Sequence, residues 1–156
     1  MAWLDGWLVI AARPGRALRW AQAYAAKVLE QVGVVPDELR ESSGIAVSRT
    51  QPGVIWSHND SGDGPTLYAI DMSGTLLARI AVSNAMARDW EEIAAGPCPM
   101  AATVSAGQAQ ASCRFVADTG DNDQVRREVS IYVVVEPTVG GSDSALTVAA
   151  RSFNLG

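Results

Sequence analysis

Short apolar runs alternate with turn residues from residue 33 onward, and this pattern predicts β-strands. The runs are rich in Val, Ile, Tyr and Trp, which favour strands, and Gly, Pro, Asn, Asp and Ser separate them. The segment 71–74 (Asp-Met-Ser-Gly) predicts a tight hairpin turn in which Gly74 takes a positive φ. We therefore expect an all-β domain over residues 33–156.

A four-part pattern occurs twice in this region, with a period of about 50 residues or slightly more. The first pass covers about 41–83 and the second about 89–153. Four short antiparallel strands per repeat are typical of a propeller blade, so the pattern predicts two four-stranded blades of an incomplete β-propeller. Missing blades or a partner chain are expected to cover its open edge. The alternative is a small β-sandwich.

Residues 1–32 have a different pattern and are expected to form an N-terminal helical or leader segment. Residues 16–32 contain many good helix formers, with Leu18, Ala21 and Ala25 near one face. Residues 2–12 are apolar, but they resemble a signal peptide poorly and are too short to span a membrane. A packed amphipathic helix, a disordered leader and the remnant of an export segment remain alternatives.

The chain is acidic, with a formal net charge of −5 and a pI near 4.7. It has no basic stripe that would neutralise phosphates, so nucleic acid is not expected as a partner. An apolar content of 48% and a charged content of 19% are those of an ordinary soluble domain. The excess of carboxylates either maintains solubility or, where carboxylates converge, binds a hard cation.

Cys98 and Cys113 are the only two cysteines, and they flank an insert of small residues at 99–112. Both are placed where two strands of a hairpin would meet a long loop, so we predict a Cys98–Cys113 disulfide. The bond would indicate an oxidising compartment. The alternative is a pair of unrelated buried thiols.

The polar residues of both passes are predicted to gather on one face. Strands of a blade run up and down, so the start of the first strand and the turn after the second lie at the same end. The polar residues expected beside the candidate metal ligands are Ser42, Ser43, Asn59 and Asp63. Oxygen ligands suit Ca²⁺ or another hard divalent cation. The candidate metal ligands are Glu41, Asp60, Asp89, Glu91, Asp118, Asp121 and Asn122.

His58, Asp60 and Glu91 are the candidate catalytic residues, with His58, the only histidine, as a general base or transition-metal ligand. Each of these polar residues can also be explained as part of a turn or of the core. Asp, Asn, Ser and Gly are common in turns, where Asp and Asn side chains bond their own backbone. Trp90 is expected in the core between the blades. Asp71 and Glu136 follow third strands and are expected to be solvated.

The motifs together resemble a family of bacterial, mostly exported β-propeller proteins, some described as WD40-like or phytase-esterase-like. The resemblance covers roughly residues 33–137 and rests on six segments, at 38–49, 52–62, 67–71, 88–94, 117–122 and 131–137. The Cys98/Cys113 pair is also similar to cysteines of the family. Three positions depart from its motifs: Glu92 replaces an Asp, Ala117 a Gly and Thr119 an Ile. The resemblance implies further blades after Phe153.

Three hypotheses for function follow. The first is a binding or scaffold module of a periplasmic or secreted propeller, with a polar face that holds Ca²⁺ or another divalent cation. The second is a metal-dependent hydrolase of phytase, esterase or lactonase type, in which the metal polarises a phosphoryl or carbonyl oxygen and activates water. The third is a truncated product without independent activity. The ligand is expected to be a small molecule or a protein.

Overall fold

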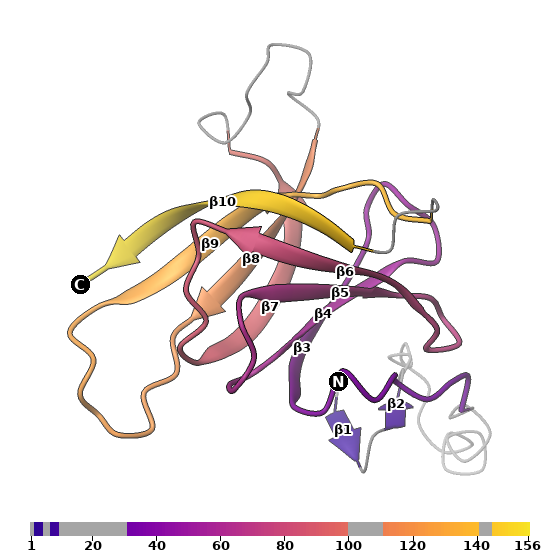
Figure 1. Cartoon of the computed structure of the whole chain (residues 1–156), viewed down its shortest axis with the longest axis horizontal. Coiled ribbons are helices and arrows are strands. Elements are labelled where there is room, and N and C mark those ends of the chain that lie inside the picture. Colours follow the sequence, from indigo (N-terminus) through magenta and orange to yellow (C-terminus); the bar gives the residue numbers. More distant parts are fainter. Residues whose placement is uncertain (1, 5–6, 10–30, 100–110, 141–144) are drawn as a thin grey trace, which may run out of the picture.

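The computed structural model describes residues 2–4, 7–9, 31–99, 111–140 and 145–156, and its regular elements are all strands. Two short strands pair near the N-terminus, and eight longer ones form the domain (Figure 1). The strands are β1 (Ala2–Leu4), β2 (Trp7–Val9), β3 (Ser42–Val47), β4 (Ile55–Asn59), β5 (Thr66–Ile70), β6 (Leu76–Ser83), β7 (Trp90–Pro97), β8 (Ser112–Asp118), β9 (Val129–Val135) and β10 (Ala145–Leu155).

The eight strands form one sheet in the order β3-β4-β5-β6-β10-β9-β8-β7. Strands β3 to β6 form a first antiparallel unit and β7 to β10 a second. Strand β10 joins the units, because its first half pairs in parallel with β6 and its second half pairs with β9. At the other end of the sheet the Ser43 hydroxyl of β3 donates to the Trp90 carbonyl of β7 at 2.7 Å. The sheet is therefore nearly closed and barrel-like.

The all-β prediction is confirmed for the described residues. The turn at 71–74 also forms as expected, with Gly74 at φ 88° and the Asp71 carboxylate accepting from the Ser73 amide. The number of blades and the division at residue 32 stay predictions. The helix expected over 16–32 lies almost wholly outside the described residues. Within that range only residues 31 and 32 are described, and neither is helical. The strand pair β1–β2 was not expected.

The main core lies between the two units. Apolar residues alternate along the strands, so one face of each four-stranded unit buries Ala, Val, Ile and Trp against the other unit. Trp56 of the first unit is fully buried, and Trp90 of the second is 1% exposed, which confirms the expected core position of Trp90. A second, smaller cluster covers the far face of the first unit, where Leu39 packs on Ile55, Tyr68 and Ile70.

A buried ion pair of the second unit lies where that unit meets the first. Glu136, which follows β9, accepts hydrogen bonds from Ser48, from Trp56 Nε1 at 2.9 Å and from Thr50 at 3.0 Å, and pairs with Arg114 of β8. The Arg114 side chain is 0% exposed and that of Glu136 is 2% exposed. The expectation that Glu136 is solvated is therefore wrong. The strand pattern placed Glu136 at an exposed strand end, but the turn between β3 and β4, with Ser48 and Thr50, folds over it.

The Cys98–Cys113 disulfide is formed. The two residues lie at facing ends of β7 and β8, where Gly96 pairs with Cys113 in the ladder and the Cys98 amide donates to the Ala111 carbonyl at 2.9 Å. The bond therefore fixes the base of the hairpin that carries the insert. It packs against Val133 on the face of the second unit that points away from the first.

We expect Glu136→Gln to lower the free energy of unfolding by about 3–5 kcal/mol, because it leaves the buried Arg114 charge without a partner. Burial alone would raise the pKa of Glu136, but the Ser48, Trp56 and Ser112 hydrogen bonds and the Arg114 charge lower it from 4.5 to about 2. The stabilisation is therefore complete above pH 4.5 and is lost as the pH falls toward 2. Urea unfolding at several pH values measures both effects. The exposed Glu128→Gln is the control, and equal stability of the two variants would contradict this role.

Candidate metal centre

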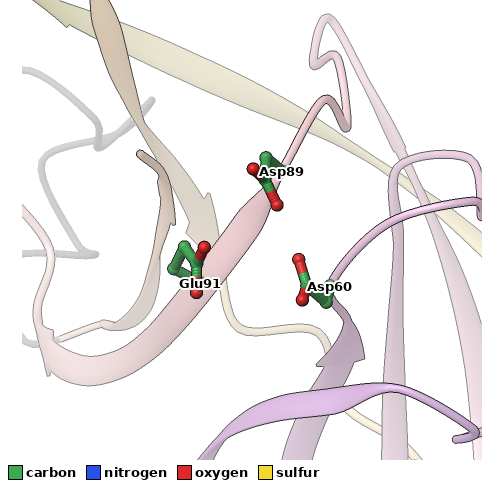
Figure 2. Close-up of side chains that lie close together, drawn as sticks. All are labelled: Asp60, Asp89 and Glu91. Atoms are coloured by element: carbon green, nitrogen blue, oxygen red, sulfur yellow. The ribbon is translucent and has the colours of Figure 1, made fainter. Parts of the chain in front are cut away.

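Three carboxylates meet where the two units join. Asp60 directly follows β4, Asp89 directly precedes β7, and Glu91 lies within β7. One carboxylate oxygen from each lies within 4.8 Å of the others. Figure 2 shows the Asp60 and Asp89 side chains directed toward one another, with Glu91 beside them. The Trp90 amide donates to the Asp60 carbonyl at 2.9 Å, and this bond holds the two chain segments together.

The backbone around the cluster is fixed on both sides. The Asp60 amide donates to the Glu41 carbonyl at 2.8 Å, and the Asp89 amide donates to the Asp118 carboxylate at 3.0 Å. The Gly120 amide donates to the Asp89 carbonyl at 3.1 Å. The carboxylates thus project from a backbone that strand pairing and turns hold in place, which favours a pre-organised site.

The electrostatics of the cluster are unfavourable without a cation. Asp60 and Asp89 are half-buried and Glu91 is exposed. The Oδ1 atoms of Asp60 and Asp89 are buried, and neither has a hydrogen-bond partner among the described residues. Burial, a hydrogen bond with Asp89 and the charges of Glu91, Asp89 and Glu41 raise the pKa of Asp60 to about 6. A proton or a cation at this point would relieve the repulsion.

Gly120 allows the loop after β8 to approach the cluster. A Cβ atom at this position would lie 2.1 Å from Asp89 Cγ and 2.5 Å from Glu91 Oε1. No side chain fits there unless the carboxylates move. The glycine therefore sets how closely this loop can cover Asp89 and Glu91.

The other predicted ligands of the second unit surround the cluster without joining it. Asn122 donates to the Asp89 carboxylate at 3.3 Å. The Asp118 carboxylate is buried and pairs with Arg126 at 2.8 Å. The Asp121 carboxylate accepts from the Val125 and Arg126 amides, as in an ordinary turn. Asp118 and Asp121 therefore shape the loop that carries Gly120.

The predicted residues of the first unit lie near Asp60 but have other partners. Ser42 bonds Ser57 at 2.6 Å, so the start of β3 lies beside the end of β4 as expected. The Asn59 side chain accepts from the Glu41 amide at 3.1 Å and donates to Asp63. Glu41 is exposed and acts on Asp60 through its charge.

His58 lies inside the protein. It is 0% exposed, its Nδ1 bonds the Asn59 carbonyl at 3.0 Å, and its ring contacts Trp90 edge to face at a centroid distance of 5.7 Å. Burial lowers the pKa of His58 and keeps the ring neutral at neutral pH. This position gives a general-base role at the carboxylate cluster no direct support.

Two residues that hold the site were not identified from the sequence. Arg126 donates to the Asp118 carboxylate and to the Gly120 carbonyl, both at 2.8 Å. It therefore ties the loop of Gly120 to the end of β8. An arginine a few residues after an Asp-rich turn is a weak signal, because most such residues are solvated. Gly120 was visible only as one turn residue among many.

No family model, curated protein or solved structure matches this chain. The function of this chain is therefore inferred from the site itself. Three converging carboxylates, of which Asp60 and Asp89 each have a buried oxygen without a hydrogen-bond partner among the described residues, suit a hard divalent cation. Water or a ligand would complete its coordination. Among the residues that the structure describes, no helix is long and apolar enough to cross a membrane.

We expect Gly120→Ala to destabilise the protein by about 1–3 kcal/mol, because the new methyl group overlaps Asp89 and Glu91. Gly64→Ala is the matched control, since nothing lies within 4 Å of the Cβ position at Gly64 and a positive φ is not required there. We expect the control to change stability by less than about 0.5 kcal/mol. Thermal unfolding measures both variants, and equal melting temperatures would show that the close approach at Gly120 is not required.

We expect Asp89→Asn to lower the pKa of Asp60 from about 6 toward its ordinary value of 3.8. The change removes one of the neighbouring charges that favour the protonated form. In the wild type the raised pKa stabilises the fold below pH 3.8, and this contribution is lost as the pH rises through 6. Side-chain carboxyl NMR shifts, recorded without divalent cations, measure the titration. The exposed Asp123→Asn should leave it unchanged. Titration of wild-type Asp60 near pH 4 would contradict the expectation.

Proposed function

We propose that this protein is a binding or scaffold module whose cation site is formed by Asp60, Asp89 and Glu91 and holds Ca²⁺ or a similar hard divalent cation. The observation that carries the proposal is the pair of buried Oδ1 atoms on Asp60 and Asp89, which have no hydrogen-bond partner among the described residues. Buried carboxylate oxygens normally accept hydrogen bonds. Two such oxygens that accept none from the described residues favour an ion between them.

The ligand chemistry favours a hard cation over a transition metal. All three groups offer oxygen, within 4.8 Å of one another. Nitrogen and sulfur ligands, which transition metals prefer, are not part of this cluster. His58 is buried beside Trp90 and the cysteines are bonded to each other, which supports the same choice.

We further propose that the two four-stranded units are two blades of a β-propeller, of the exported bacterial type that the sequence motifs resemble. The order of strands within each unit and the packing of one unit on the other support this assignment. The disulfide is compatible with an oxidising compartment, so we place the protein in the periplasm or outside the cell.

A binding role is favoured over a metal-dependent hydrolase by the position of the only histidine. A hydrolase of the kind considered would need a base within reach of a metal-bound water. His58 is fully buried and its Nδ1 is already bonded to the Asn59 carbonyl. The cation is therefore assigned a structural and ligand-binding role, in which it joins the two units and offers open coordination positions on the surface.

We expect Ca²⁺ to stabilise the wild-type chain, by about 2.7 kcal/mol at 100 times its dissociation constant. Asp60→Asn and Asp89→Asn should abolish most of this gain, because each removes a charged ligand. Asp123→Asn, in the neighbouring loop, should keep the gain. Thermal unfolding with and without millimolar Ca²⁺ measures the effect, and Mg²⁺ at the same concentration tests selectivity.

The same variants separate the two functions. An equal response of Asp60→Asn and the wild type to Ca²⁺ would refute the cation site. Turnover of model phosphate or carboxylate esters that requires Ca²⁺ and is lost in Asp60→Asn would instead favour the hydrolase. Binding of the cation without turnover supports the proposed module.

A further inference from the structure

A cavity of about 390 Å³ lies between the second unit and the connecting segment 84–88, which joins the two units. Its walls are this segment, the end of β8, the start of β9 and the end of β10. None of Asp60, Asp89 and Glu91 lines it, so it is separate from the candidate cation site. Small-molecule sites in proteins have volumes of about 300–1,000 Å³, and this cavity falls within that range.

The inner face of the second unit changes from apolar to polar where the cavity begins. Val134 and Ala150 face each other on β9 and β10 and belong to the main core. The next two pairs on the same face line the cavity, and they are Tyr132 with Ser152 and Ser130 with Asn154. Hydroxyl and amide groups thus replace aliphatic ones at this end of the face, which favours a polar ligand over an apolar one.

The Tyr132 hydroxyl has an unused hydrogen at the cavity. Tyr132 is 6% exposed, and its ring packs against Trp90 at a centroid distance of 6.1 Å. Its oxygen accepts from the Met86 amide at 3.2 Å, and no described residue accepts the hydroxyl hydrogen. Trp90 Nε1 donates to the Met86 carbonyl at 2.9 Å. The connecting segment is therefore fixed at Met86, and the Tyr132 hydroxyl remains free to donate to a ligand.

Four charged side chains line the cavity, and two of them neutralise each other. Arg126 pairs with Asp118 at 2.8 Å. Arg88, on the connecting segment, and Glu128, directly before β9, form no ion pair among the described residues. Both are exposed, so each can turn toward a ligand. The cavity therefore offers one unpaired positive charge and one unpaired negative charge, from two different segments.

We propose that this cavity binds a small zwitterion, an α-amino acid with a free carboxylate and a free ammonium group. Arg88 and the Tyr132 hydroxyl donate to the carboxylate, and the Glu128 carboxylate accepts from the ammonium group. A guanidinium group recognises a carboxylate through two parallel hydrogen bonds. The four wall charges sum to zero, as do those of the ligand. A simple anion would face Glu128 and a simple cation would face Arg88, so neither matches the wall as well.

The apolar part of the wall indicates the side chain of the amino acid. Ala85 and Met86 line the cavity on the connecting segment, and Met86 is 58% exposed. A methionine side chain is flexible and adapts to apolar groups of different shape. We therefore expect an aliphatic amino acid such as leucine to bind more tightly than serine.

The test is a titration of the full chain with L-leucine, followed by amide NMR in buffer freed of divalent cations. We expect saturable shifts at millimolar leucine in residues 84–88 and 128–132. L-Leucinamide lacks the carboxylate and N-acetyl-L-leucine lacks the ammonium charge. Each should bind about tenfold more weakly, because each loses a hydrogen bond between charged groups. Absence of saturable shifts with both leucine and serine would overturn the proposal, as would equal affinities for leucine and its two derivatives.

Two variants remove the unpaired charges one at a time. Arg88→Gln should abolish the preference for leucine over leucinamide, and Glu128→Gln the preference for leucine over N-acetyl-leucine. Both side chains are exposed, so the melting temperature should stay nearly unchanged. Arg127→Gln is the control, because Arg127 is exposed and does not line the cavity. An equal loss of leucine affinity in Arg127→Gln would overturn the assignment to this cavity.

A further comparison separates this cavity from the cation site. Asp60→Asn should bind leucine as the wild type does, with or without Ca²⁺. Leucine binding that requires Ca²⁺, or that is lost in Asp60→Asn, would place the ligand on the cation and overturn the proposal. Failure of the cation site would leave leucine binding intact, since no residue of the carboxylate cluster lines the cavity.

Discussion

The packing of one four-stranded unit against the other is the constraint on which the rest of the molecule depends. Each unit alone is a small sheet with one apolar face, and such a face is stable only when it is covered. The core between the units buries Trp56 and Trp90 almost completely. Since the hydrophobic effect is not directional, this core provides stability but leaves the exact position of the two sheets to polar contacts.

Polar contacts at both ends of the interface fix that position. At one end Glu136 of the second unit accepts from Ser48, Thr50 and Trp56 of the first, while Arg114 neutralises it. At the other end the Trp90 amide donates to the Asp60 carbonyl. A sliding motion of the sheets would break both sets of bonds, and the carboxylate cluster lies directly beside the second set.

The candidate cation site and the open outer face have a common origin in the repeat. Repetition places a polar strand start and a polar turn at the same end of each unit, so two neighbouring units bring their carboxylates together. The same repetition gives every unit two apolar faces, and on the outer face of the second unit the buried residues are Cys98, Cys113 and Val133. One face of the first unit is covered by the segment around Leu39, whereas Phe153 and Leu155 of the second unit are exposed.

The sequence alone determined the all-β fold, the turn with Gly74, the disulfide and the end of each unit at which polar residues gather. These features depend on local patterns: alternation along a strand, turn chemistry and the spacing of two cysteines across a hairpin. Only the tertiary structure decided which carboxylates meet. Asp60, Asp89 and Glu91 converge, whereas Asp118 and Asp121 bond Arg126 and the turn backbone. It also buried Glu136 and His58. Burial of a polar side chain depends on which distant segment packs over it, and no local pattern encodes that.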